Sequence, residues 1–214
     1  MPRSTLAPAP PPPGALDAAP YWVDGFLPPA VRAQMLEELR WAFWKPSTVV
    51  ELTRAGELRS RTSAARVSES TDEAWFSDAL KDQLRAVEGR LTEWFGIRPE
   101  QCERWQATRY PRGGTFDYHF DCGYWGHEPA GDREHTILIY LKQPAEGGST
   151  RFRELDLDVE PRAGRLLVWK NLLPNGERNP AMLHSSVPIV RGTKTVLVTW
   201  ARQRDVRTPS AEGT

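Results

Sequence analysis

The stretch TFDYHFDCGYW, residues 115–125, places a histidine and a carboxylate two positions apart among aromatic side chains. Residues i and i+2 of a strand project to the same face, so Asp117, His119 and Asp121 are expected together. The aromatic residues between them would then face an apolar layer. Burying an imidazole beside a carboxylate is costly unless both are satisfied, and a metal ion is one partner that does so.

An H-x-D pair alone is a weak signal, because it is equally consistent with a plain His–Asp hydrogen bond. A third ligand from elsewhere in the chain would complete the 2-His-1-carboxylate arrangement of non-haem Fe(II) sites. The segment LHSSVPIVRGTKTVLVTWA, residues 183–201, offers His184 at the start of one strand and Lys194 at the start of the next.

Lys194 would share a strand face with Val196, Val198 and Trp200. A lysine on such a face is unusual both on a solvated surface and in a core. It fits a point charge at the bottom of a pocket that pairs with a bound carboxylate. The alternative is an edge lysine that extends its ammonium group to water.

Two helices are expected to support this region. Residues 27–43 and 71–96 carry apolar side chains at helical spacing, with Thr71 as a candidate N-cap and Gly96 directly after the second helix. The apolar stripe of the second helix is interpreted as core and consists of Trp75, Leu80, Leu84, Val87, Leu91 and Phe95.

From residue 103 the chain changes to short alternating runs separated by Gly, Pro and Asn. The candidate strands are 103–109, 115–121, 135–141, 150–154, 165–169, 184–190 and 193–202. Regularly spaced strands of this kind are typical of a β-sandwich or barrel. The sequence therefore predicts a mainly β fold with flanking helices.

Composition limits the other possibilities. The 214 residues suit one domain, and 28 basic residues balance 28 acidic ones, so neither a nucleic acid nor a membrane surface is expected as a partner. No apolar run is long enough to span a bilayer. Two cysteines make no disulfide framework, which favours a reduced, cytoplasmic setting. We expect a disordered Pro-rich tail over 1–20, a single domain over 21–204 and a flexible tail over 205–214.

Several ordered motifs resemble those of the 2-oxoglutarate- and Fe(II)-dependent dioxygenases, most specifically the prolyl-4-hydroxylase-like branch. They are RTS (61–63), ATRYPRGGTFDYHFD (107–121), REHTILIYLKQPAEGGSTRF (133–152) and AGRLLVWKNLLPNGERNPAMLHSSVPIVRGTKTVLVTW (163–200). Together they span residues 61–202, and their order and spacing are far more specific than any one of them.

The resemblance implies a double-stranded β-helix, a jelly-roll with a cupin-like core. It implies that His119, Asp121 and His184 ligate Fe(II) and that Lys194 holds the distal carboxylate of 2-oxoglutarate. Further positions that match the family's cosubstrate pocket are Tyr110, Thr136, Tyr140 and Trp200.

The implied reaction is hydroxylation of an unactivated C–H bond, with O2 and 2-oxoglutarate consumed, succinate and CO2 released, and ascorbate as a candidate reductant. Related halogenases have a small residue in place of the carboxylate ligand, so Asp121 favours hydroxylation. The expected substrate is a peptidyl or free amino acid, and another small metabolite stays open. A cupin-like metal protein that does not use 2-oxoglutarate is the less favoured alternative, and a silent binding module would be expected to lack a ligand.

Substrate specificity is expected in the loops 53–69 and 122–134. Their candidate substrate contacts are Arg61, Tyr124 and Trp125. Of the remaining histidines, His127 is expected to be exposed and His135 to pack or face solvent. The sequence leaves the oligomeric state open.

Overall fold

The computed structural model describes residues 9–12, 14–16, 19–53 and 57–207. Its α-helices are Pro29–Glu38 (α1) and Asp78–Phe95 (α2), and short 3-10 helices lie at Leu39–Trp41, Glu73–Trp75, Pro99–Gln101 and Pro180–Met182. The strands are Tyr21–Val23 (β1), Lys45–Pro46 (β2), Val49–Leu52 (β3), Leu58–Arg61 (β4), Arg66–Val67 (β5), Glu69–Asp72 (β6), Gln106–Tyr110 (β7), Thr115–His119 (β8), Arg133–Lys142 (β9), Glu146–Gly147 (β10), Thr150–Phe152 (β11), Leu157–Val159 (β12), Leu166–Lys170 (β13), His184–Ser186 (β14), Ile189–Arg191 (β15) and Lys194–Arg202 (β16).

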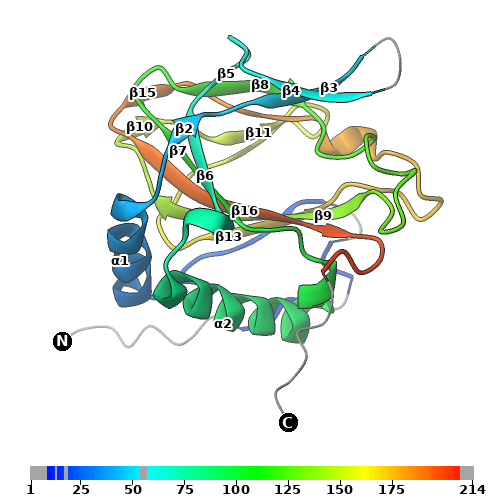
Figure 1. The fold of residues 1–214 in the computed structure, drawn as a ribbon, viewed down its shortest axis with the longest axis horizontal. Coiled ribbons are helices and arrows are strands. Elements are labelled where there is room, and N and C mark those ends of the chain that lie inside the picture. The colour runs from blue at the N-terminus through cyan, green and yellow to red at the C-terminus, as the bar shows by residue number, and fades with distance from the viewer. Residues whose placement is uncertain (1–8, 13, 17–18, 54–56, 208–214) are drawn as a thin grey trace.

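Two antiparallel sheets face each other, and both helices lie along the outer side of the larger one (Figure 1). The seven-stranded sheet has the order β1-β13-β9-β16-β7-β6-β2, and the five-stranded sheet has the order β12-β11-β14-β8-β5. Two further pairs, β10-β15 and β3-β4, complete the described strands. The mainly β fold with flanking helices is therefore confirmed.

The strands of the larger sheet separate the interior into two clusters. In β9, Ile137 and Ile139 pack toward the helices, whereas Leu138 and Tyr140 pack toward the smaller sheet. This alternation follows from the pleat, in which successive side chains leave opposite faces. Residues with even numbers in β9 therefore face the space between the two sheets.

Helix α2 begins later than predicted. Ser77 caps it, because its hydroxyl accepts a hydrogen bond from the Leu80 amide at 3.1 Å. Thr71 lies in β6 instead, so its expected role as N-cap is wrong. Trp75 falls in the 3-10 turn before the helix and is 56% exposed, so it is not part of the buried stripe. Gly96 ends the helix in the left-handed conformation, φ 69°, as predicted.

The predicted strand 115–121 is interrupted by a β-bulge. His119 of β8 pairs with His184 of β14, but Phe116 pairs with Ser186, so two residues of β8 stand opposite one residue of β14. The prediction that Asp117 shares a face with His119 and Asp121 is therefore wrong, whereas His119 and Asp121 do line one pocket. Asp117 is exposed, and Phe116 turns to the side of His119.

Other boundaries also shift. The expected strand 184–190 is divided into β14 and β15, and the expected strand 103–109 begins only at β7. Much of the predicted N-terminal tail lies outside the described residues, but Leu16 packs against the core. No helix in the described part of the chain is long and apolar enough to cross a membrane.

Candidate metal centre

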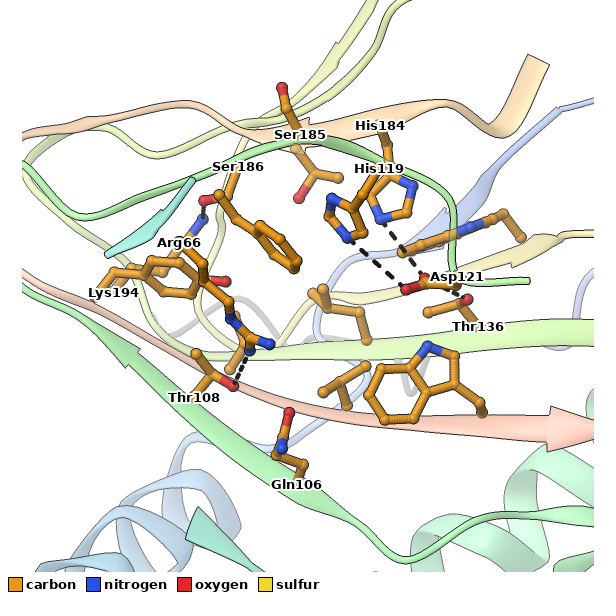
Figure 2. Close-up of a pocket in the computed structure, with 18 residues that line it drawn as sticks. Arg66, Gln106, Thr108, His119, Asp121, Thr136, His184, Ser185, Ser186 and Lys194 are labelled. Carbon is orange, nitrogen blue, oxygen red and sulfur yellow. Dashed lines mark hydrogen bonds and ion pairs between the residues drawn. The ribbon is translucent and has the colours of Figure 1, made fainter. Parts of the chain in front are cut away.

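A pocket lies between the two sheets (Figure 2). The larger sheet contributes Gln106, Thr108, Tyr110, Thr136, Leu138, Trp169, Lys194, Val196, Val198 and Trp200. The side of the smaller sheet contributes Arg66, Phe116, His119, Thr150, His184, Ser185 and Ser186, and Asp121 follows β8. Polar groups from segments far apart in the sequence thus converge on one space.

His119, Asp121 and His184 come together at one end of this pocket (Figure 2). Their closest ligand atoms all lie within 4.8 Å of one another. The His119 Nε2 atom is 3.8 Å from Asp121 Oδ1, and His184 Nε2 is 3.6 Å from Asp121 Oδ2. Two imidazole nitrogens and one carboxylate on one side of a point are the donor set of a facial Fe(II) site.

The backbone fixes both imidazoles in the same orientation. The Nδ1 atom of His119 lies 2.8 Å from the Asp117 carbonyl oxygen, and that of His184 lies 2.9 Å from the Met182 carbonyl oxygen. A carbonyl can only accept, so Nδ1 carries the proton in each ring and donates it. Each Nε2 atom therefore faces Asp121, and in a neutral imidazole its lone pair is available to a metal.

Two neutral side chains hold the Asp121 carboxylate in place. The Thr136 hydroxyl donates to Asp121 Oδ2 at 2.8 Å, and the Asn171 side-chain amide donates to the Thr136 oxygen at 2.9 Å. Hydrogen bonds of this kind orient ligands and tune their basicity. Thr136, which the resemblance assigns to the cosubstrate pocket, therefore contacts the carboxylate of the triad directly.

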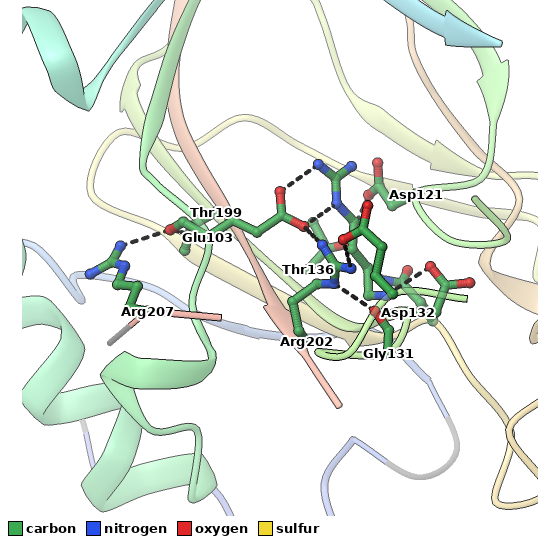
Figure 3. A network of polar contacts seen from close by, with 11 residues as sticks. Glu103, Asp121, Gly131, Asp132, Thr136, Thr199, Arg202 and Arg207 are labelled. Carbon is green, nitrogen blue, oxygen red and sulfur yellow. Dashed lines mark hydrogen bonds and ion pairs between the residues drawn. The ribbon is translucent and has the colours of Figure 1, made fainter. Parts of the chain in front are cut away.

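A charged network lies behind Asp121 (Figure 3). Arg133 donates to both carboxylate oxygens of Glu103, at 2.8 and 2.7 Å. Its guanidinium lies 3.8 Å from the ring centroid of Trp125 and 3.7 Å from that of Trp200. Arg133 thus joins the loop after β8 to the last strand of the larger sheet and adds positive charge near Asp121.

Burial and charge set the protonation states that a metal requires. Burial, reinforced by the neighbouring His184, lowers the pKa of His119 to about 3, so its imidazole is neutral at physiological pH. Burial alone would raise the pKa of the Asp121 carboxyl, but His184, Arg133 and the Thr136 hydrogen bond outweigh it and lower that pKa. Neutral imidazole and ionised carboxylate are the forms that bind metals.

Lys194 lies at the other end of the pocket (Figure 2). Its side chain is buried, at 2% exposure, and its Nζ atom donates to the Gly148 carbonyl at 2.7 Å and to the Ser186 hydroxyl at 2.6 Å. No described carboxylate pairs with it. Burial therefore lowers the pKa of the Lys194 ammonium to about 7. Such a cation is suited to bind an anionic ligand group.

The other predicted site residues divide into two groups. Tyr110, Thr136 and Trp200 line the pocket, with the Tyr110 ring 4.5 Å from Lys194 Nζ. Tyr140 does not line it, but its hydroxyl lies 2.6 Å from that of Thr150, which does.

The three predicted substrate contacts lie outside the pocket lining. Arg61 is exposed on β4 and pairs with Glu51. Tyr124 and Trp125 pack against each other in the loop after β8, with ring centroids 5.4 Å apart. The structure therefore does not place these three residues in the pocket. Among the histidines, His127 is exposed, as predicted.

Sequence reasoning missed several lining residues. Arg66 was visible only as one of many charges in the loop 53–69, and nothing in that loop distinguished it. Trp169 packs edge-on against His184, with ring centroids 4.8 Å apart, and its place in β13 could have been found from strand alternation with Leu167. Ser186 could have been found from its position two residues after His184.

Residues 105–202 match the sequence model of the 2OG-Fe(II) oxygenase superfamily. Prolyl 4-hydroxylase subunit alpha-2 of Caenorhabditis elegans is 30% identical over 177 residues, which cover 80% of this chain and 32% of that protein. Prolyl 4-hydroxylase subunit alpha-1 of Gallus gallus is 31% identical over 149 residues, which cover 67% of this chain and 28% of that protein. The chain thus spans about a third of the length of these relatives.

Residues 105–202 form a 2OG-Fe(II) oxygenase domain.

Solved structures of this superfamily share the fold. The viral collagen prolyl hydroxylase of Paramecium bursaria Chlorella virus-1 superposes with a TM-score of 0.65 at 21% identity, over 88% of this chain and 99% of that one. A Pseudomonas putida prolyl-4-hydroxylase superposes with a TM-score of 0.56 at 24% identity, over 86% of this chain and 92% of that one. The jelly-roll expected from the sequence is confirmed by this match.

The superfamily implies Fe(II), 2-oxoglutarate and O2 as the cofactor and cosubstrates. The donor set of this chain fits Fe(II), because two imidazoles and one carboxylate face a common point. The buried Lys194 ammonium fits a dicarboxylate that reaches from that point across the pocket.

Proposed function

We propose that this chain is an Fe(II)/2-oxoglutarate-dependent dioxygenase that hydroxylates an unactivated C–H bond of a peptidyl or free amino acid, as a prolyl 4-hydroxylase does. Succinate and CO2 would be the products of the cosubstrate. The observation that carries this proposal is the pairing of two features in one pocket. A His-Asp-His cluster lies at one end and a buried lysine without a described carboxylate partner lies at the other.

His119, Asp121 and His184 would hold Fe(II), which supplies O2 activation when bound. The protein's own contribution is to keep these ligands in the required protonation states and orientations. Thr136 fixes one oxygen of Asp121, and the backbone carbonyl of Met182 fixes His184. Preset ligands do not have to reorganise when the metal binds, which favours affinity.

Lys194 and Ser186 would bind the distal carboxylate of 2-oxoglutarate. Leu138, Val196 and Val198 form an apolar part of the pocket wall. Such walls exclude water and strengthen the ionic contact with the cosubstrate. Tyr110, packed on the Lys194 ammonium, completes this end of the pocket.

We assign the whole activity to one domain, residues 21–204, since the two sheets that build the pocket both lie within it. Peptide substrates are suggested by the names of the prolyl hydroxylase relatives. Ascorbate as a reductant is part of the proposal. The alternative is an oxygenase that acts on another small metabolite.

A cupin-like metal protein without 2-oxoglutarate chemistry is the second alternative. It would use the same three ligands but would have no need for a buried ammonium group. Leaving a lysine charged in an apolar site carries a desolvation penalty, which a carboxylate ligand offsets. The burial of Lys194 therefore favours the oxygenase.

The test is an anaerobic titration of the metal-free protein with Fe(II) and then with 2-oxoglutarate, followed by the weak visible charge-transfer band of the chelate. We expect the band in the wild type and its loss in His119→Ala. The exposed His127→Ala is the matched control and should keep it. Iron binding without the band in the wild type would reject the oxygenase and favour the cupin-like protein.

A further inference from the structure

Arg66 is a second cation in the pocket. It lies on β5, at the edge of the smaller sheet, and its side chain extends into the space between the sheets (Figure 2). Its guanidinium carbon is 4.6 Å from the ring centroid of Phe116, and that ring stacks on His119 with centroids 3.6 Å apart. A single aromatic ring thus contacts both the guanidinium and a proposed metal ligand.

The hydrogen bonds of Arg66 leave its charge uncompensated. They go to the Thr48 carbonyl at 3.0 Å and to hydroxyl oxygens of Ser68, Ser70 and Thr108 at 3.3, 3.5 and 3.3 Å. All four acceptors are neutral, and the three hydroxyl contacts are longer than a typical charge-assisted bond. No described carboxylate forms an ion pair with this side chain.

The cofactor and cosubstrate would not supply the missing charge. Fe(II) carries two positive charges, Asp121 one negative charge, 2-oxoglutarate two negative charges and Lys194 one positive charge, so these groups neutralise one another. Arg66 remains as one unmatched cation in the loaded pocket. Because a guanidinium stays protonated in proteins, only an anionic group of another ligand can match it.

The side-chain amide of Gln106, near Arg66, has an oxygen that lacks a hydrogen-bond donor in the described part of the chain. The Oε1 atom of Gln106 is buried and has no hydrogen-bond partner among the described residues. Gln106 lies two residues before Thr108 on β7, so both side chains face the pocket and Thr108 contacts Arg66. The pocket wall therefore offers a cation for a carboxylate and, close by, an acceptor for an N–H group.

We propose that the substrate carries a carboxylate that binds Arg66, next to an amine or amide N–H that donates to Gln106. This chemistry describes a free amino acid or the C-terminal residue of a peptide, and it disfavours an internal peptidyl residue. The proposal rests on the proposed function and deepens it, because Arg66 becomes its specificity-determining residue.

The test uses the protein loaded anaerobically with Fe(II) and 2-oxoglutarate. The common free L-amino acids, their N-acetyl derivatives and their carboxamides are titrated, and each dissociation constant is read from the shift of the visible band. Succinate formation in air measures turnover of each compound. For the best compound we expect the carboxylate to bind about 10- to 100-fold more tightly than the carboxamide, as expected for a charge-assisted hydrogen bond. The N-acetyl derivative distinguishes a free amino acid from a C-terminal residue.

Variants assign this preference to Arg66. Arg66→Gln should remove the difference between carboxylate and carboxamide while the band of bound 2-oxoglutarate persists, and Arg66→Lys should restore part of the difference. Arg151→Gln is the matched control, because Arg151 is half-exposed and pairs with Asp158 away from the pocket lining. If Arg66→Gln does not fold, the comparison of carboxylate with carboxamide in the wild type still decides whether the pocket recognises a substrate carboxylate.

Two results would overturn the proposal while the proposed function stands. One is that a peptide blocked at both ends, with an internal proline, binds and turns over as well as any carboxylate. The other is that no carboxylate in the panel shifts the band. A wild-type protein that never forms the band would instead reject the proposed function, and this inference with it.

Discussion

The rings of Phe116 and His119 stack on one side of β8, with centroids 3.6 Å apart and planes inclined by 18°. The bulge between β8 and β14 makes this contact possible, because it turns residues three apart to the same side. His119 is thereby fixed from two directions, by the Phe116 ring and by the Asp117 carbonyl.

Removal of the Phe116 ring should weaken metal binding. An aromatic stack contributes about 0.5–1.5 kcal/mol beyond burial, so we expect Phe116→Ala to lower Fe(II) affinity by about 2- to 13-fold. Anaerobic titration with Fe(II) measures this loss of affinity. Tyr118→Ala is the matched control, since Tyr118 is on the same strand but 42% exposed, and it should leave the affinity unchanged. Equal affinities in both variants would mean that the stack does not position His119.

The regular parts of the site could be predicted from the sequence. The face of β16 that carries Lys194, Val196, Val198 and Trp200 lines the pocket as the alternation predicts. This succeeds because a long strand in the middle of a sheet has no freedom to change which residues face inward. The same rule brings Thr136 and Leu138 of β9 into the pocket.

The irregular parts could not be predicted. The bulge depends on how β8 pairs with β14, which lies more than sixty residues later, and no local pattern reports that pairing. Arg66 lies in a two-residue strand, too short for a periodic signal. The exposure of Trp75 also could not be predicted. The helical spacing of apolar residues includes Trp75, although the helix begins only after the N-cap Ser77.

Replacement of Lys194 should separate cosubstrate binding from iron binding. We expect Lys194→Met to raise the dissociation constant of 2-oxoglutarate by about 100-fold, because a buried carboxylate loses its charged partner. Fe(II) affinity should be unchanged. The metal-free variant should be at least as stable as the wild type in thermal unfolding, since a buried ammonium without a described counter-charge is removed.

Lys142→Met, an exposed change on β9, serves as the control for this substitution. It should preserve the affinity for 2-oxoglutarate. Unchanged cosubstrate affinity in Lys194→Met would mean that another residue binds the distal carboxylate.

Binding of 2-oxoglutarate should depend on pH through Lys194. Burial lowers the pKa of this ammonium to about 7 in the free protein, and the ligand requires the protonated form. Affinity should therefore be constant below about pH 7 and fall about tenfold per pH unit above it. Tyr110 packs on the ammonium, and burial raises the pKa of its phenol, so it stays neutral over this range.

The stability of the ligand-free protein should change in the opposite direction. The folded-state pKa of Lys194 is below its ordinary value of 10.5, so the unfolded chain binds more protons between about pH 7 and that value. The contribution of Lys194 to the free energy of unfolding therefore rises with pH over this interval. Denaturant unfolding at several pH values, with Lys194→Met as the reference, measures this sign, and titration of 2-oxoglutarate at the same pH values measures the other. A pH-independent affinity in the wild type would contradict the lowered pKa.

The hydroxyl of Thr136 should matter more for iron than for folding. Thr136→Val preserves the side-chain shape but removes the hydrogen bond to Asp121 Oδ2 and leaves the Asn171 amide without its acceptor. Loss of a group that orients a metal ligand typically reduces affinity by about 10- to 100-fold, and we expect Fe(II) binding to weaken by that factor. Thr136→Ser should restore Fe(II) affinity, since the serine hydroxyl can make the same contact.

Thr199→Val removes a buried hydroxyl that donates to the Glu103 carbonyl at 2.7 Å, away from the triad. This control should lower the unfolding temperature without changing Fe(II) affinity, whereas an equal loss of iron binding in both valine variants would assign the effect to general destabilisation.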